Sequence, residues 1–240
     1  MTSTAPAVTP RREIGFKELV ALVAMLMAMN ALAIDSMLPA LPAIGEGLGV
    51  GDANQRQWVV TAYLLGFGVT QIIYGPLADR FGRRPVLFTG VAIYVLFSAV
   101  AAFAWSFEAL LAARVLQGVG TASTRVLAVA IVRDQYEGRR MAQVMSLSFL
   151  VFLAVPILAP SVGALILMLG PWRWIFAVLG LFGVAILVWA AMRLPETLKP
   201  ENRMPIDLRR IGAAAWETVS SRLSIGYTLA MAVIVGCLFG

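Results

Sequence analysis

Long apolar stretches alternate along the chain with short segments that carry most of its charged residues. A helix needs about 20 apolar residues to cross the hydrocarbon core of a bilayer. The apolar stretches are Leu19–Leu38, Trp58–Leu77, Val86–Phe103, Ala109–Val132, Met145–Leu169, Trp174–Met192 and Ile225–Gly240. This pattern predicts an all-α integral membrane protein that crosses the bilayer several times.

Lysine and arginine residues are concentrated in alternate gaps between these stretches. They lie in the N-terminal segment and after the second, fourth and sixth stretches, and only Arg56, Arg114, Arg125 and Arg173 among the 19 basic residues lie elsewhere. Cytoplasmic loops of membrane proteins carry such an excess of positive charge. The N-terminus is therefore predicted to lie in the cytoplasm.

The composition narrows the range of functions. The chain is 60% hydrophobic, with a mean hydropathy of +0.84, and its net charge of +6 comes from the predicted cytoplasmic segments, so we expect no nucleic-acid partner. The single cysteine, Cys237, allows neither a disulfide framework nor a zinc cluster. Without histidine, proton transfer would need a carboxylate. We expect neither an enzyme nor a bound cofactor, because the stretches contain no nucleophile–base pair or metal-ligand cluster.

Connection lengths predict the domain organisation. We expect a polar cytoplasmic tail at residues 1–18, a six-span bundle at 19–192, a charged cytoplasmic linker at 193–224 and the start of a second bundle at 225–240. A seventh helix alone would have little to pack against, so we expect the chain to be the first half of a larger protein with the start of its second half. A complete seven-span protein is the alternative.

Three charged residues interrupt the stretches: Asp35, Arg114 and Arg125. Charged side chains inside a membrane are costly, so they are candidates for a functional site. Counted from Lys17 and Arg133 at 1.5 Å per residue, Asp35 and Arg114 lie at similar depths of about 27–29 Å. They can pair or compete for one partner if their helices face each other. Alternatively, Asp35 caps the outer end of its helix in headgroup water.

The fourth stretch carries a polar face. At 100° per residue, one stripe about 16 Å long contains Arg114, Gln117, Thr121 and Arg125. Such a stripe should line a water-filled cavity or a polar contact. On the first stretch, Met27 flanks the Asp35 face and could give an adaptable apolar contact to a ligand or face lipid. In the fifth stretch, Pro156, Pro160 and Gly163 indicate a hinge or a close helix contact.

The gap after the second stretch contains a distinctive motif. Its characteristic residues are Gly75, Asp79, Arg80, Gly82, Arg83 and Arg84. The segment resembles the major facilitator superfamily signature G-x-L-x-D-R-x-G-R-R/K-x-x-L. The resemblance implies a six-helix N-terminal bundle built as a 3+3 inverted repeat, with an incomplete seventh span. It also implies that Asp79, Arg80 and Arg83 act as a conformational latch near the partner half.

Further motifs resemble one group of that superfamily. Arg114 to Gly120 is similar to the R-x-x-Q-G-x-G motif of drug/proton antiporters, in which the arginine tunes proton transfer. Ala159 to Ala164 is similar to their G-P-x-x-G-G motif, with alanine at two glycine positions. The segments around Asp35, Asp134 and Glu196 resemble the bicyclomycin/chloramphenicol-resistance (Bcr/CflA-type) branch.

The resemblance implies a proton-driven multidrug exporter in a bacterial inner membrane, monomeric when complete. Its partners would be protons, a small drug-like molecule and the bilayer. Asp35 would exchange the proton and Arg114 would favour its ionised form. Two alternatives stay open. The protein could carry a metabolite or an organic anion, with Arg125 as the anion site, or the chain could be a truncated product that transports nothing.

Overall fold

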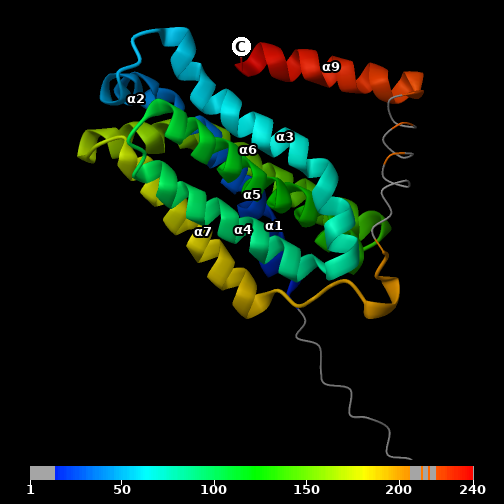
Figure 1. Ribbon diagram of the computed structural model, residues 1–240. Coiled ribbons are helices and arrows are strands. Elements are labelled where there is room, and N and C mark those ends of the chain that lie inside the picture. Colours follow the sequence, from blue (N-terminus) through cyan, green and yellow to red (C-terminus); the bar gives the residue numbers. More distant parts are fainter. Residues whose placement is uncertain (1–13, 206–211, 213–215, 217–219, 240) are drawn as a thin grey trace, which may run out of the picture. The chain divides into compact units, whose positions relative to one another are not determined.

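The computed structural model describes residues 14–205, 212, 216 and 220–239 (Figure 1). They fall into two compact units, Met1–Arg203 and Met204–Gly240. The elements of the first unit are α1 (Phe16–Asp35), η1 (Leu38–Ala40), α2 (Leu41–Leu48), α3 (Ala53–Phe81), α4 (Arg83–Ala102), α5 (Phe107–Gln135), α6 (Gly138–Leu169), α7 (Arg173–Arg193) and η2 (Pro200–Asn202). In the second unit, the main described helix is α9 (Arg222–Phe239).

The predicted all-α membrane fold is confirmed. Six helices of the first unit are long and apolar enough to cross a membrane, and they correspond to the first six predicted stretches. Most extend several residues beyond the predicted bounds, because their ends are polar turns that hydropathy alone does not detect. A shorter apolar helix, Ser224–Ile234, covers most of the seventh stretch, whose last residue, Gly240, lies outside the described residues, as do residues 1–13 of the predicted tail.

The first predicted stretch, Leu19–Leu38, differs from the structure at its end. The helix α1 ends at Asp35, before the predicted Leu38, and the next residues form η1 and the short helix α2. Pro39 and Pro42 each lie at the second position of one of these helices, in the first turn, where proline is tolerated because the N–H that it lacks would have no intrahelical partner. The helix α2 ends at Gly49, whose φ of 73° is accessible to glycine at little cost.

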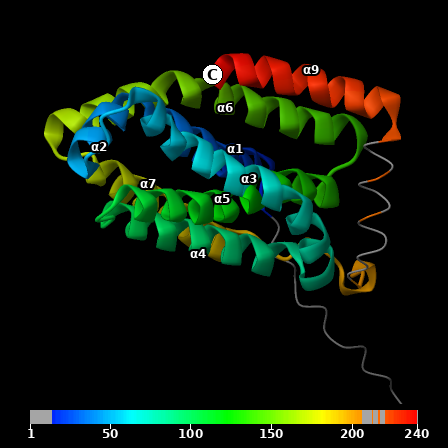
Figure 2. The same ribbon diagram turned by 45° about the horizontal axis from the view of Figure 1, so that its top comes forward.

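The helices α1 and α5 are the most buried spans, and α6 is the most exposed. The helix α5 lies between α3 and α4 in both views (Figures 1 and 2). Glycines make these two contacts close: a Cβ atom on Gly118 would lie 2.1 Å from the carbonyl oxygen of Tyr63, and one on Gly120 would lie 2.6 Å from that of Gly90. Small residues let membrane helices approach at this distance.

We predict that Gly118→Ala destabilises the bundle. The added methyl group would push against the backbone of α3, and overpacking of this kind costs about 1–3 kcal/mol. Thermal unfolding of the detergent-solubilised chain should therefore show a lower midpoint. Gly68→Ala is the matched control, because Gly68 lies in α3 and a Cβ atom added there would meet nothing within 4 Å. Equal midpoints for the two variants would contradict a close α3–α5 contact.

Candidate functional site

The guanidinium of Arg114, on α5, lies between helices of the first unit, and its side chain is fully enclosed. Its Nε donates to the carbonyl oxygen of Val59 on α3 at 3.0 Å, and one terminal nitrogen donates to that of Ala33 on α1 at 3.0 Å. The other terminal nitrogen donates to Oε1 of Gln117, one turn along α5, at 2.7 Å. One side chain on α5 thus joins three spans.

Further groups extend this network to α4 and α7. The amide of Gln117 donates to Oγ of Ser98 on α4 at 2.7 Å. The guanidinium of Arg114 lies 4.4 Å from the ring centroid of Tyr63 on α3 and 5.9 Å from that of Phe176 on α7. A desolvated cation over an aromatic face is stabilised by the ring quadrupole, by about 2 kcal/mol in buried examples.

Sequence reasoning missed three members of this network: Asn30, Tyr63 and Ser98. The Tyr63 hydroxyl donates to Oδ1 of Asn30 at 2.9 Å, which adds a second polar link between α3 and α1. Asn30 could have been found by the test applied to Arg114, because an amide inside an apolar stretch also needs a partner. Tyr63 and Ser98 gave no such signal, since both residue types are common in membrane helices.

Asp35 is the last residue of α1 and is 9% exposed. Arg114 reaches this level of the bundle, as their matched depths predict, but it bonds to the Ala33 carbonyl, two residues before Asp35, and no salt bridge joins the two side chains. Among the residues that the structure describes, Asp35 has no hydrogen-bond or ion-pair partner. The structure thus brings the acid and the base into one region without pairing them.

The other residues proposed to line a cavity have different surroundings. Gln117 and Thr121 are fully enclosed, and Met27 is buried. The Thr121 hydroxyl donates to the Gln117 carbonyl oxygen at 2.9 Å. This part of the predicted stripe forms a polar contact between helices, the second of the two expectations. Arg125 alone is half-buried, and it has no partner in the described part of the chain.

The helix α6 places its motif beside the end of α1. Pro156 and Pro160 lie inside α6, which continues from Gly138 to Leu169. A Cβ atom on Gly163 would lie 2.2 Å from the carbonyl oxygen of Ser36, so α6 touches the residue that follows Asp35. Of the two interpretations of this motif, a hinge or a close helix contact, the geometry at Gly163 fits the close contact.

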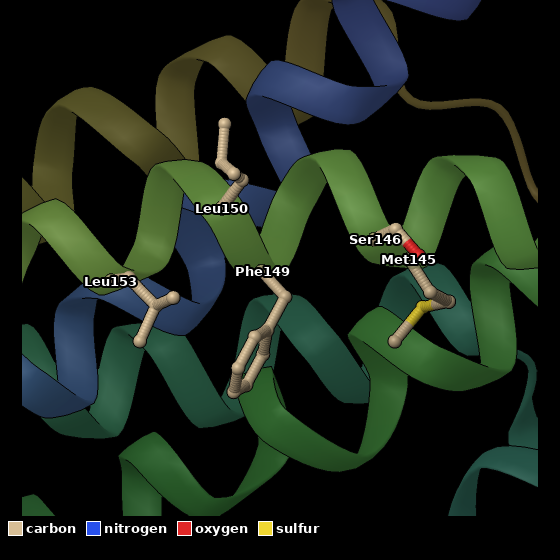
Figure 3. A pocket seen from close by; sticks show the side chains of 5 residues that line it. All are labelled: Met145, Ser146, Phe149, Leu150 and Leu153. Atoms are coloured by element: carbon tan, nitrogen blue, oxygen red, sulfur yellow. The ribbon is translucent and has the colours of Figure 1, made fainter.

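The exposed face of the same helix carries a shallow apolar hollow of about 390 Å³ (Figure 3). Its lining residues all belong to α6 and are Met145, Ser146, Phe149, Leu150 and Leu153. Figure 3 shows Met145, Phe149 and Leu153, spaced four residues apart, pointing to the same side of the helix. This side could contact a lipophilic ligand or another apolar protein surface.

The loop between α3 and α4 holds a charged cluster around Arg83, whose side chain is 5% exposed. Its guanidinium pairs with Asp79 at 2.7 Å and with Asp134, at the end of α5, at 3.0 Å. The Thr197 hydroxyl also donates to Asp134, at 3.0 Å. Asp79 and Arg83 thus link three spans and the segment after α7 within the first unit.

Glu196 caps the start of α4. Its carboxylate accepts hydrogen bonds from the backbone N–H groups of Arg83 at 2.9 Å and Arg84 at 3.2 Å, as the segment after α7 passes the start of α4 (Figure 1). An anion is favoured at a helix N-terminus. Gly82, with φ 103°, allows this approach, because a Cβ atom there would lie 2.6 Å from the Glu196 carboxylate.

The remaining motif residues lie at the edge of this cluster. Arg84 donates to the Ala191 carbonyl oxygen of α7 at 2.6 Å. Arg80 is exposed and lies 5.2 Å from the ring centroid of Phe81, and a Cβ atom added to Gly75 would meet nothing within 4 Å. Sequence reasoning recognised these residues but missed the capping role of Glu196, because no local pattern shows which helix a distant acid will reach.

A family model and a relative that match this chain both belong to one superfamily of transporters. The family model described as "Major Facilitator Superfamily" matches residues 23–240. The MFS-type transporter YdgK of Bacillus subtilis is 35% identical over 90% of this chain and 54% of its own length. Multidrug resistance protein MdtL of Salmonella heidelberg is 35% identical over 84% of this chain and 51% of its own length. The chain thus spans about half the length of these relatives.

Solved structures share the fold. The human organic anion transporter MFSD10 superposes with a TM-score of 0.65 at 23% identity, over 83% of this chain and 53% of its own. A peptide transporter, POT, superposes with a TM-score of 0.67 at 20% identity, over 96% of this chain and 49% of its own. At these identities the likeness concerns the fold alone.

We predict that Arg114→Lys destabilises the bundle although it keeps the charge. A lysine ammonium cannot reproduce the planar set of donors that serves Val59, Gln117 and Ala33 together, and each buried group left unpaired costs about 1–3 kcal/mol. The midpoint of thermal unfolding should fall well below that of Arg139→Lys, a control at an exposed arginine. A midpoint equal to the control would show that the network adds little to stability.

Proposed function

The chain belongs to the Major Facilitator Superfamily, and on this basis we propose that the protein to which it belongs is a proton-coupled exporter of small drug-like molecules. The six spans of the first unit would form one of two bundles that rock about a central site. A second bundle would complete that site, since the chain spans about half the length of its relatives.

The observation that supports proton coupling most directly is the state of Asp35. It is a buried carboxylate without a partner among the described residues, at the end of α1, and Arg114 is held two residues away at Ala33. An unpaired carboxylate removed from water is destabilised when ionised and can become neutral by taking up a proton. The group that would carry the proton is thus separate from the cation that holds the helices together.

Protonation of Asp35 would act on the helix contacts around it. The end of α1 is held on one side by Arg114 of α5 and touches Gly163 of α6 on another. Neutralising Asp35 changes the free energy of any arrangement in which these helices enclose it, relative to one in which water reaches it. A proton can shift the balance between outward and inward states only through such a difference.

The drug-export assignment rests on motifs and relatives. The R-x-x-Q-G-x-G match at Arg114 and the relatives named multidrug resistance protein MdtL both favour it. We place the protein in the bicyclomycin/chloramphenicol-resistance branch and in a bacterial inner membrane with a cytoplasmic N-terminus. The apolar hollow on α6, with Met145 and Phe149, would form part of an adaptable wall for lipophilic substrates.

A second function is favoured by Arg125 alone. This guanidinium is half-buried in a span and lacks a partner among the described residues, so a substrate carboxylate or phosphate could pair with it. The protein would then carry an organic anion and not a cationic or neutral drug.

We predict that Asp35→Asn, made in the complete gene product, abolishes drug efflux driven by an imposed pH gradient in vesicles. Asparagine keeps the size of the side chain and removes the group that exchanges the proton. Glu46→Gln is the control, because Glu46 is an exposed acid of α2, near the same end of α1. Undiminished proton-driven efflux in Asp35→Asn would exclude this residue from the coupling mechanism.

We predict that Arg125→Ala leaves efflux of cationic drugs within about twofold of the wild type, because no described residue depends on this guanidinium. The same vesicles, loaded with cationic and anionic fluorescent substrates in turn, give the measurement. If anion transport occurs and only that transport is lost, the second function is the correct one.

A further inference from the structure

A groove of about 510 Å³ lies between α3 and α4, away from the Arg114 network. Ile73, Leu77 and Phe81 of α3 form one side, Val86 and Ile93 of α4 form the other, and Val119 of α5 lies at its base. These three elements are all candidate membrane spans, and most of the side chains that line the groove are apolar. The groove is therefore built from groups that prefer an apolar occupant.

The threonines of the groove do not change its apolar character. The Thr70 hydroxyl donates to the Gly66 carbonyl oxygen at 2.6 Å, and the Thr89 hydroxyl donates to that of Pro85 at 3.0 Å. Each bond is made within the residue's own helix, so neither side chain needs a polar group from a ligand. An acyl chain could lie against them without leaving a hydrogen bond unmade.

Tyr74 is the exception among the lining residues. It is 5% exposed and lines the groove, and its hydroxyl has no hydrogen-bond partner among residues 14–205. A hydroxyl that lies in apolar surroundings without a hydrogen-bond partner is unfavourable. A ligand in this groove should thus carry a hydrogen-bond acceptor or donor near the level of Tyr74.

A cation without an acidic partner lies at the end of the groove. Phe81 is the last lining residue of α3, and the guanidinium of the adjacent Arg80 lies 5.2 Å from its ring centroid. Asp79, the nearest acid in sequence, is paired with Arg83. No acidic side chain within the described ranges pairs with Arg80, so its charge can attract an anion at the predicted cytoplasmic edge of the membrane.

We propose that this groove is a binding site for an anionic glycerophospholipid. One acyl chain would lie between α3 and α4, an ester oxygen would accept from the Tyr74 hydroxyl, and the headgroup phosphate would pair with Arg80. These groups follow one another along α3 in the order of the parts of a lipid: the apolar wall for the acyl chain, Tyr74 for the ester and Arg80 for the phosphate. Tyr74 and Arg80 are separated by about 9 Å of helix. Basic residues at the cytoplasmic leaflet favour anionic lipids.

A protein occupant explains these features less well. A helix packed into the groove would cover its apolar wall, but it would also need an acceptor for Tyr74 and an acid for Arg80. A phospholipid supplies both groups and the hydrocarbon in one molecule, and it is present in excess around every spanning helix. The proposal is independent of drug export, since it requires only that the bundle lies in a membrane.

Photocrosslinking tests the site directly. The complete gene product would be placed in nanodiscs of phosphatidylcholine with a minor fraction of phosphatidylglycerol that carries a diazirine in one acyl chain. After irradiation, adducts would be mapped by mass spectrometry of peptides. We expect adducts concentrated on groove residues of α3 and α4, and a several-fold lower yield when the diazirine lipid is phosphatidylcholine.

Three variants separate the parts of the proposal. Arg80→Gln should reduce the preference for phosphatidylglycerol about fivefold, as expected for one basic residue at an anionic surface, whereas Arg139→Gln, an exposed control, should not. Thr89→Phe should block adducts by filling the groove while leaving Arg80 in place. Tyr74→Phe should lower the yield with both lipids, since both carry ester oxygens.

Three results would overturn the proposal. Adducts spread evenly over the groove and the exposed face of α6 would indicate ordinary boundary lipid. Equal preference in Arg80→Gln and Arg139→Gln would remove the headgroup site. Groove residues free of adducts in the complete protein, with both diazirine lipids, would show that another part of the protein covers the groove.

Discussion

The six-span unit depends on the requirement that a guanidinium inside a membrane has its hydrogen bonds satisfied by protein. Arg114 meets this requirement by donating to backbone carbonyls of two other helices and to the side-chain amide of Gln117 on its own helix. The Val59 carbonyl lies inside α3 and can accept a second bond, whereas the Ala33 carbonyl lies in the last turn of α1, where carbonyls lack an intrahelical donor, so Arg114 supplies a missing partner there. The cost of the buried cation is thereby offset by contacts that fix α1, α3 and α5 at one level. If those helices slid apart, a charge would be left unpaired in hydrocarbon, where the penalty is several kcal/mol.

A second charged cluster lies at the opposite ends of α3 and α5. There Arg83 joins the ends of α3 and α5, and Glu196 caps α4 from a segment more than a hundred residues later in the chain. Between the two clusters, glycines bring the backbones of α3, α4 and α5 into contact. Close-packed interiors resist gradual deformation. A bundle fixed at both ends and tightly packed between them is suited to move as a rigid body, which is what rocking of two halves requires.

The spans could be predicted from the sequence because they are long and apolar. The residues of the buried network on α5 could be predicted because each is a polar residue inside an apolar stretch. The sequence could not identify the partners of Arg114, since carbonyl oxygens of Val59 and Ala33 have no sequence signature. The α3–α4 loop motif was recognised as a unit, but the role of Glu196 depends on a fold-back that no local pattern encodes. The helix α2 was missed for a simpler reason: it has only eight residues, so it is too short to appear as an apolar stretch, and a proline such as Pro42 does not by itself distinguish the start of a helix from a loop.

The separation of Arg114 from Asp35 decides how the proposed coupling can work. If the two were paired, protonation of the acid would break the bond that holds α1 to α5, and each transport cycle would disrupt the bundle. In the observed arrangement Arg114 is bound to the Ala33 carbonyl, and this bond would not depend on the charge of Asp35, because a backbone carbonyl does not titrate. The bundle can then keep its internal packing while the free energy of exposing or enclosing Asp35 changes with its protonation. Protonation of Asp35 would then act on the contact between the end of α1 and α6, and not on the Arg114 network.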